Sequence, residues 1–407
     1  MSSVTCRGCG APVDDVMVDL GMSPLANSYI PVERGPGSEV FRPLRAVVCA
    51  RCFFVQLDHV ADPGDIFSDY AYFSSWSTSW LDHARRFADD AVRRLGLGPD
   101  SLVVELASND GYLLRWFAER GIAVLGVEPA ANVAAVAAER GIPTLVRFFG
   151  AETANDIVRE QGRADLVVAN NVLAHVPDLH DFVEGISILL APGGRATVEF
   201  PHLLRLVQEV QFDTIYHEHY SYLSLLALEP ALAVHGLSVV DVERLTTHGG
   251  SLRVHLSASG SATEAVERVR GEERAAGLDR IETYAAFGQQ VAARKRSILR
   301  FLFDLHDRAL TVAGYGAPAK GNTLLNYCGI RTDLVSFTVD ANPAKQGTLL
   351  PGSHIPVLPP DALRERRPDR VVLLPWNLRD ELVESLADVR GWGGRFVVLQ
   401  PEPAELA

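Results

Sequence analysis

Residues 101–111 of the chain read Ser-Leu-Val-Val-Glu-Leu-Ala-Ser-Asn-Asp-Gly, an apolar run that ends in a turn of small and polar residues. The run up to Glu105 predicts a buried parallel strand, and the residues after the turn predict a helix over 112–120. The alternation continues through expected strands over 123–128, 164–170 and 195–200, a helix over 180–190, and a turn at Pro192-Gly-Gly194. This β-α-β order predicts a doubly wound α/β sheet, which binds its ligands at the carboxyl ends of the strands.

The first turn of this sheet suits a nucleoside ligand. Small residues let the backbone approach the ligand, and an acid after the second strand can accept both ribose hydroxyls. The turn resembles the E/D-x-G-x-G-x-G of class I S-adenosylmethionine-dependent methyltransferases, with alanine and asparagine in place of the first two glycines. The predicted cofactor-binding residues are Glu105, Ala107, Asn109, Gly111, Glu128 and, at the end of a later strand, Asn170. A dinucleotide dehydrogenase could also use the acid, but a Pro-Gly-Gly turn before a strand is common in this region of the methyltransferases.

The bulk properties of the chain limit its partners. A length of 407 residues fits two or three domains, and 47% hydrophobic with 22% charged residues is ordinary for a soluble globular protein. The net charge of -13 disfavours nucleic acid as a partner, because phosphate binding needs a basic face. No apolar run approaches the roughly 20 residues of a membrane span, and the N-terminus lacks the pattern of a secretory signal. We therefore expect a cytoplasmic protein without a membrane partner.

Four of the five cysteines form two Cys-x-x-Cys knuckles, Cys6-Arg-Gly-Cys9 and Cys49-Ala-Arg-Cys52. Two knuckles supply a tetrahedron of thiolates, which structural zinc prefers and which leaves no open position for a substrate. We predict that Cys6, Cys9, Cys49 and Cys52 bind a structural zinc ion far from the chemistry, with free or redox-active thiols as the alternative. The fifth cysteine, Cys328, is expected to be a small buried residue in a helix.

Three regions of the chain differ in pattern. Residues 1–80 predict a small zinc-binding module, and residues 81–258 hold the doubly wound sheet. Residues 259–407 start with a polar, helix-prone stretch over 262–310, which we expect to connect the two α/β domains. The remainder of this third region alternates again and predicts a C-terminal Rossmann-like domain.

The C-terminal region opens with a strand, a glycine turn and a helix start over 310–321, and Asp340 ends the next expected strand. Helix N-termini bind phosphate, and an acid after the second strand can contact a ribose. Pro318 and Lys320 break the Gly-x-Gly-x-x-Gly pattern of a pyridine dinucleotide site. The turn is therefore interpreted either as a site for a substrate's diphosphate or as part of the scaffold.

The segment Tyr216-His-Glu-His-Tyr-Ser-Tyr222 holds two histidines, one acid and three tyrosines in seven residues. It offers a general base, an acid that orients the base, and hydroxyls that stabilise an oxyanion. A shared role for Glu218 and His219 requires an irregular turn or helix, because a regular strand would point them to opposite sides. A metal site and a plain polar loop are the alternatives. Separate histidines, namely His202, His248 and His255, are interpreted as surface or core residues.

The two knuckles and the segments 105–111, 170–175, 216–222 and 316–322 together resemble the sugar C-methyltransferases of antibiotic deoxysugar pathways. The resemblance covers essentially the whole chain, with the motifs in the same order. It implies a zinc-binding N-terminal domain, a central methyltransferase domain and a C-terminal Rossmann-like domain. It also implies methylation by S-adenosylmethionine of a dTDP-4-keto-deoxysugar at the carbon next to the ketone, with C-3 favoured over C-5.

By this resemblance, His219 would be the general base of the reaction. The other catalytic residues would be Tyr216, Glu218, His175 and Tyr70, and the substrate-binding residues would be Asn171, Tyr222, Lys320 and Asn322. A carbon next to a ketone is acidic because its charge delocalises onto oxygen as an enolate, and a neutral histidine can remove its proton. A nicotinamide-dependent oxidoreductase on a nucleotide sugar and an inactive binding scaffold are the competing hypotheses.

Overall fold

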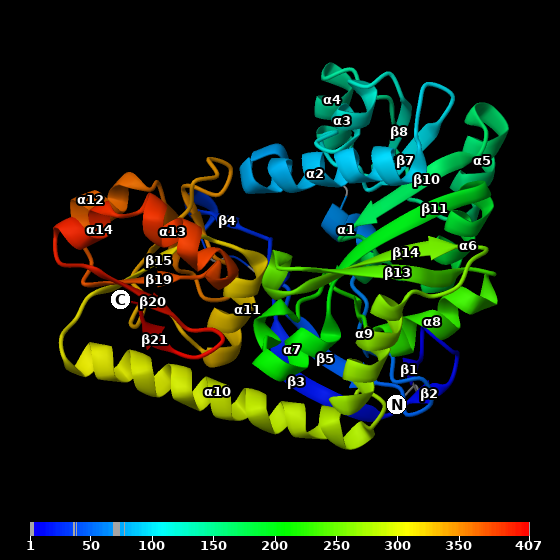
Figure 1. The fold of residues 1–407 in the computed structure, drawn as a ribbon. Coiled ribbons are helices and arrows are strands. Elements are labelled where there is room, and N and C mark those ends of the chain that lie inside the picture. Colours follow the sequence, from blue (N-terminus) through cyan, green and yellow to red (C-terminus); the bar gives the residue numbers. More distant parts are fainter. Residues whose placement is uncertain (1–3, 36, 38, 68–73, 77, 407) are drawn as a thin grey trace.

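The computed structural model describes residues 4–35, 37, 39–67, 74–76 and 78–406, which fold into three bodies built on three sheets and a small hairpin (Figure 1). The predicted catalytic residue Tyr70 lies outside the described residues. In the part of the chain that is described, no helix combines the length and the apolar character that a bilayer crossing needs.

The central body carries a seven-stranded sheet in the order β13-β14-β11-β10-β7-β8-β9. Its parallel strands are β7 (Leu102–Leu106), β8 (Ala123–Val127), β9 (Thr144–Leu145), β10 (Ala164–Asn170) and β11 (Leu190–Pro201). The last two, β13 (Ser238–Leu245) and β14 (Ser251–Ser257), run antiparallel to their neighbours. Because β8 and β10 lie on opposite sides of β7, the strand order reverses there, and such a switch point is where α/β sheets bind ligands.

Helices cover both faces of this sheet, as the apolar alternation within its strands requires. Val103 packs into the hydrophobic cluster on one face of the sheet. Val104 and Leu106 pack into a second cluster on the opposite face, because successive side chains of a strand point to opposite sides. The surrounding helices are α2 (Thr78–Leu95), α3 (Leu114–Ala118), α4 (Ala131–Glu139), α5 (Ala151–Gln161), α6 (Leu179–Leu189) and α8 (Leu225–Val234). The predicted doubly wound fold of the central region is confirmed.

The expected turn at residues 192–194 is an irregularity inside β11 instead. Ala164 pairs with Leu190 while Leu166 pairs with Arg195, so β11 contains extra residues at this point. Gly193 has a φ of 82°, and a Cβ on Gly194 would lie 2.9 Å from the Ala164 carbonyl oxygen. Two glycines let the strand bulge and then resume its pairing, which a turn-forming sequence alone does not reveal.

The N-terminal body holds a four-stranded antiparallel sheet in the order β12-β6-β5-β3. Three of its strands come from the N-terminal region: β3 (Asp15–Ser23), β5 (Arg42–Val48) and β6 (Val55–Leu57). The fourth, β12 (Ser221–Tyr222), comes from the polar segment of the central region. A separate hairpin of β1 (Val4–Thr5) and β2 (Pro12–Val13) frames the first cysteine knuckle, and α1 (Pro63–Phe67) follows the sheet.

The C-terminal body has an eight-stranded sheet in the order β21-β20-β19-β15-β16-β18-β17-β4. Its parallel core consists of β15 (Val312–Tyr315), β16 (Thr338–Val339), β18 (Pro356–Leu358), β19 (Arg370–Leu373) and β20 (Arg395–Val398). Antiparallel strands at the edges are β17 (Thr348–Leu349), β21 (Ala404–Glu405) and β4 (Ile30–Pro31), the last supplied by the N-terminal region. The helices are α11 (Ala319–Cys328), α12 (Asp361–Arg366), α13 (Arg379–Ser385) and α14 (Asp388–Gly391). Cys328 is buried in α11, as expected.

The polar stretch over 262–310 forms α9 (Glu264–Ala275) and α10 (Ile281–Asp307), so its helical character is confirmed. Helix α10 has 27 residues, a length of roughly 40 Å, and runs beneath both large bodies (Figure 1). It packs closely on β3, because a Cβ on Gly288 would lie 3.0 Å from the Met17 carbonyl oxygen. The long helix therefore links the N-terminal sheet with the C-terminal domain.

Candidate active site

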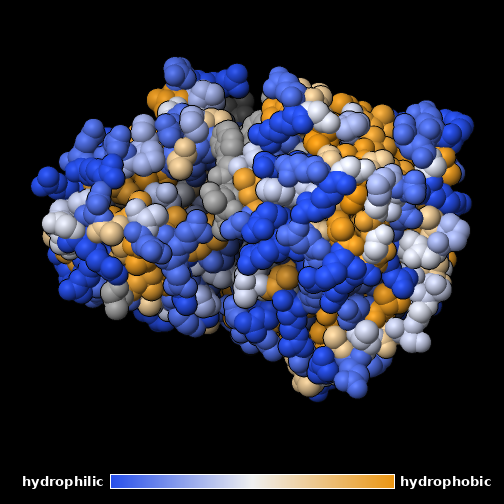
Figure 2. Space-filling view, turned by 45° about the horizontal axis from the view of Figure 1, so that its top comes forward, coloured by the Kyte–Doolittle hydropathy of each residue, from blue (hydrophilic) through white to orange (hydrophobic). Residues whose placement is uncertain are grey.

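A cavity of about 910 Å³ is lined by residues of all three bodies, and Figure 2 shows a groove between the two lobes of the molecule that are visible from this side. Its wall brings together many of the predicted site residues: Ala107, Asn109, Glu128, Asn170, Asn171, His175, Tyr216, Glu218, His219 and Lys320. The predicted residues Glu105, Gly111, Tyr222 and Asn322 are described but do not line the cavity. Residues widely separated in sequence thus share one chamber large enough for two ligands.

The turn after β7 has the backbone conformation of a glycine-rich motif, although it contains only one glycine. Ala107, Asn109 and Gly111 all have left-handed backbones, with φ of 52°, 51° and 75°. Asparagine tolerates this conformation, and its Oδ1 accepts a hydrogen bond of 2.8 Å from the Ser74 amide. Gly111 must remain glycine, because a Cβ there would lie 2.9 Å from the Ile142 side chain. The departure from the usual motif therefore leaves the shape of the turn intact.

The acid after β8 is held at the cavity wall by this same turn. The Glu128 carboxylate accepts hydrogen bonds from the Asn109 amide at 3.0 Å and the Ala130 amide at 2.8 Å. Burial raises the pKa of Glu128, and burial raises that of Glu105 well above its ordinary value. Glu105 lies behind the turn, hydrogen-bonded to Tyr112, so its position supports the turn instead of facing the ligand.

Polar atoms at the end of β10 fit an S-adenosylmethionine site. Among the described residues, the Oδ1 atoms of Asn170 and Asn171 are buried and have no hydrogen-bond partner. Asn171 has a φ of 55°, the same left-handed conformation that asparagine adopts in the turn after β7. These acceptors and Glu128 line the cavity beside the glycine-like turn, which is the polar arrangement that a nucleoside with a charged tail requires.

The hydrogen bonds of His219 define its protonation state. Nδ1 lies 2.9 Å from the Thr214 carbonyl oxygen, so Nδ1 carries the proton and donates it. In the neutral ring Nε2 then holds the lone pair, which accepts a hydrogen bond of 2.8 Å from the Tyr216 hydroxyl. Burial, reinforced by His175, holds the pKa of His219 well below its ordinary value. A neutral base therefore faces the cavity at neutral pH.

The segment around His219 is an irregular turn, as a shared role of its residues requires. The His219 amide donates to the Tyr216 carbonyl oxygen at 2.9 Å, and this turn aims both Glu218 and His219 at the cavity. The carboxyl of Glu218 nevertheless does not orient the histidine. It accepts instead from the Asn27 amide group at 2.6 Å, and burial raises its pKa to about 7.

His175 lies beside His219, with 4.8 Å between the ring centroids. Its Nδ1 donates to the Glu218 carbonyl oxygen at 2.7 Å, and burial lowers its pKa to about 4. A neutral His175 therefore completes the cluster without adding positive charge next to the base.

The cavity residues that sequence reasoning missed include three with polar side chains close to the predicted ones, namely Asn27, His248 and Lys345. His248, interpreted from sequence as a surface or core residue, lines the cavity, and its ring centroid lies 5.6 Å from that of Trp80. The sequence signal available there was the pair of glycines that follows it, which indicates a turn. Asn27 and Lys345 carried none, since each reaches the cavity from another body of the molecule.

Two lysines lie on either side of the C-terminal glycine turn. Lys345 donates to the Ala317 carbonyl oxygen at 2.9 Å, and Asp340 accepts from the Ala317 amide at 2.7 Å. Burial lowers the pKa of Lys320 to about 8, so this amine is mostly charged at neutral pH. Asn322 instead donates to the Ala26 carbonyl oxygen at 3.1 Å and joins the N-terminal region to α11.

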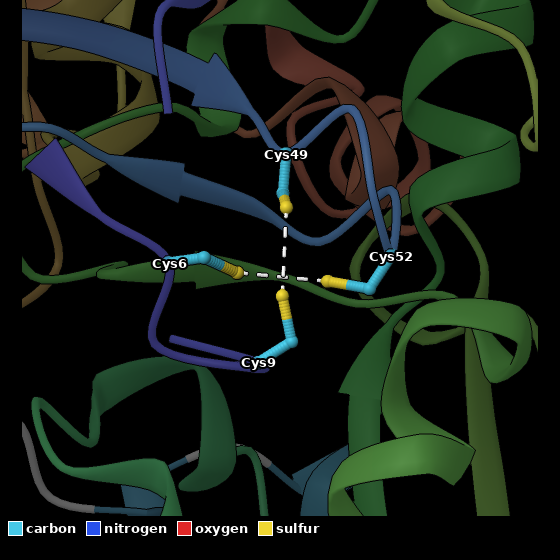
Figure 3. A group of neighbouring side chains, drawn as sticks. All are labelled: Cys6, Cys9, Cys49 and Cys52. Atoms are coloured by element: carbon cyan, nitrogen blue, oxygen red, sulfur yellow. Dashed lines mark hydrogen bonds between the residues drawn. The ribbon is translucent and has the colours of Figure 1, made fainter. Parts of the chain in front are cut away.

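The four cysteines of the two knuckles converge on one point (Figure 3). Their sulfur atoms all lie within 4.8 Å of one another, with Cys6 and Cys52 3.5 Å apart and Cys9 and Cys49 3.6 Å apart. Four sulfurs at the usual zinc distance in a tetrahedron are about 3.8 Å apart, so the arrangement fits a closed zinc site. None of the four cysteines lines the cavity, although Arg7 of the first knuckle contacts the segment that carries His219.

Known proteins match the chain over its whole length. Residues 6–67 match a zinc-binding domain, residues 80–242 a methyltransferase domain, and residues 246–401 a C-methyltransferase C-terminal domain. C-methyltransferase NovU of Streptomyces niveus is 40% identical over 404 residues, which cover 98% of this chain and 96% of that protein.

Two more distant similarities each cover less than half of this chain. A ubiquinone biosynthesis O-methyltransferase of a Methylobacterium species is 34% identical over 117 residues, 26% of this chain and 46% of that protein. The CcbJ methyltransferase structure from Streptomyces caelestis is 16% identical, with a TM-score of 0.34 over 44% of this chain and 90% of that one. The full-length relative and the three domain matches decide the question: the chain belongs to the S-adenosylmethionine-dependent C-methyltransferases that carry an N-terminal zinc-binding domain.

Proposed function

We propose that the protein methylates a dTDP-linked 4-keto-deoxysugar at a carbon next to the ketone, C-3 in preference to C-5, in the formation of a branched sugar for an antibiotic. The observation that carries the proposal is the fixed tautomer of His219, whose Nε2 lone pair is held by Tyr216 at the wall of the shared cavity. A C-methyltransferase needs such a base, because a carbon must lose a proton before it can accept a methyl group.

His219 and Tyr216 are arranged to act in sequence. When Nε2 takes the proton from the carbon, it ceases to be an acceptor, and the Tyr216 hydroxyl loses the partner it holds in the resting site. That hydroxyl then donates to the enolate oxygen, which gains negative charge at the same moment. Burial and the neighbouring charge of Lys320 disfavour the charged form of His219, so the ring releases its proton to solvent before the next turnover.

The cofactor supplies an electrophilic methyl group when bound, and the chain holds it through Glu128, Asn109 and Asn170. On the opposite side, Lys320 and Lys345 frame the N-terminus of α11 at the cavity wall. Two amines and a helix N-terminus together favour an anion, and the diphosphate of a nucleotide sugar has the required charge. The cavity thus offers one group of polar residues for each of the two ligands, and His219 lines the same cavity.

The test incubates the purified protein with S-adenosylmethionine and dTDP-4-keto-6-deoxy sugars and follows both products by mass spectrometry. A sugar heavier by one methyl group, with release of S-adenosylhomocysteine, supports the proposal. Incubation with the sugar alone in D₂O then identifies the carbon that the base deprotonates, because deuterium enters at C-3 or at C-5. His219→Asn should abolish this exchange, whereas His306→Asn, on the exposed end of α10, should not. Bound cofactor without any methyl transfer would contradict the proposed substrate.

A further inference from the structure

The catalytic segment is part of the sheet that the zinc module builds. Ser221 pairs with Gln56 and Tyr222 with Val55, so β12 extends β6 in antiparallel fashion. The Leu57 amide donates to the Tyr220 carbonyl oxygen at 3.0 Å, which continues the ladder to the residue that directly follows His219. The backbone of the general base is therefore anchored outside the methyltransferase domain.

Arg7, inside the first zinc knuckle, completes this anchor. Its guanidinium donates to the Leu57 carbonyl oxygen at 3.1 Å and also to the Tyr220 carbonyl oxygen. Its backbone amide donates to the Gln56 side chain at 2.8 Å, and that side chain donates in turn to the Thr5 carbonyl oxygen at 3.0 Å. One arginine thus joins the knuckle, strand β6 and the peptide group next to His219.

We propose that Arg7 is a positioning residue for the reaction, through which the zinc knuckle holds His219 in place; this inference rests on the proposed role of His219 as the base. A zinc ion bound by the four cysteines would fix the backbone of Arg7 from both sides, because Cys6 and Cys9 flank it in the knuckle. Such an ion with four thiolates would be doubly negative, so it would also keep the guanidinium of Arg7 close. The zinc module contributes in this way to catalysis as well as to folding.

The geometry around His219 explains why this anchor matters. The ring is held on one side by Thr214 and Tyr216, which precede it in the chain. The carbonyl oxygen of Tyr220, in the peptide bond between Tyr220 and Ser221, accepts hydrogen bonds from Arg7 and from the Leu57 amide. Without Arg7 this carbonyl keeps only the Leu57 amide as donor, so the backbone that follows His219 is held less firmly and Nε2 can shift from the substrate carbon. A displacement of about 1 Å in an active site costs on the order of 100-fold in rate.

The test compares Arg7→Ala with Arg51→Ala, which alters an exposed arginine between the two cysteines of the second knuckle. We expect both proteins to retain one zinc ion and to bind S-adenosylmethionine within about twofold of the parent. Only Arg7→Ala should lose kcat, by about 10-fold to 100-fold, with little change in KM for S-adenosylmethionine. Arg7→Lys, which keeps the charge and one donor, should recover part of the loss.

A second measurement does not depend on the identity of the sugar. Hydrogen–deuterium exchange should be faster in peptides covering 216–222 of Arg7→Ala, and unchanged there in Arg51→Ala. If zinc-replete Arg7→Ala exchanges this segment at the parent's rate, the positioning role is wrong. If the parent methylates no dTDP-4-keto sugar while the exchange difference is present, the proposed substrate fails and the positioning of the segment stands. Should Arg7→Ala fail to fold, Arg7→Lys with normal kcat and normal exchange would overturn the proposal.

Discussion

Glu218→Gln tests whether the active site keeps a carboxyl group away from water at a cost in stability. Burial raises the pKa of Glu218 from 4.5 to about 7, while the side chain accepts a hydrogen bond from Asn27 that glutamine can also accept. In the unfolded chain the carboxyl ionises near its ordinary pKa. The protonated carboxyl of Glu218 therefore contributes its full stabilisation below about pH 4.5, and this stabilisation is lost as the pH rises to 7.

The magnitude follows from the size of this pKa change. A raised pKa of this extent corresponds to about 3 kcal/mol of stability lost at pH 8, where the folded protein must bury a charge. Glutamine cannot ionise, so the variant should unfold with a free energy about 3 kcal/mol higher than the parent at pH 8. At pH 5 the same comparison should give about 1 kcal/mol, because the folded parent is then protonated.

Urea unfolding followed by tryptophan fluorescence at pH 5 and pH 8 measures both differences, with zinc content checked at each pH. Glu384→Gln, an exposed carboxylate on α13, is the matched control and should show no pH-dependent gain. A difference between Glu218→Gln and the parent below about 1 kcal/mol at pH 8, or one of equal size at both pH values, would refute the reasoning.

Three further predictions concern the ligand sites. His219→Asn should lower kcat by about 100-fold or more and leave the Kd for S-adenosylmethionine unchanged by calorimetry; full activity would exclude its role as base. Gly111→Ala should raise that Kd by about 10-fold, because its Cβ would collide with Ile142, whereas Ala107→Gly should bind normally. Cys49→Ser should lose zinc by elemental analysis and lower Tm, since a structural metal stabilises its fold; an unchanged Tm would contradict the cysteine assignment.

The sequence predicts the parts of this protein that depend on local pattern. Apolar patterns identify strands of the central sheet, and the two Cys-x-x-Cys knuckles identify the zinc site. Each strand pattern and each knuckle spans only a few residues, so each can be recognised from local sequence. The left-handed backbone at Ala107 and Asn109 is less evident, since neither residue is a glycine. Periodicity cannot find β12, which is only two residues long.

The parts of the site that were missed depend on contacts between distant residues. Asn27 contacts Glu218 across 191 positions of the chain, so nothing near either residue marks the pair. Without this partner, Glu218 was expected to orient His219, a role that the Thr214 carbonyl oxygen has instead. Lys345 reaches the cavity only because the C-terminal sheet is docked against the other bodies.

Strands β4 and β12 each pair with the sheet of another domain, and this determines how relatives of this protein can be recombined. A chimera cut at the sequence boundaries would join β6 of one parent to a foreign β12, and β17 of one parent to a foreign β4. Both junctions would combine backbone ladders from different parents next to the active site. A hybrid enzyme with a new sugar preference should therefore inherit residues 24–35 with the C-terminal domain, and residues 212–224 with the zinc knuckles.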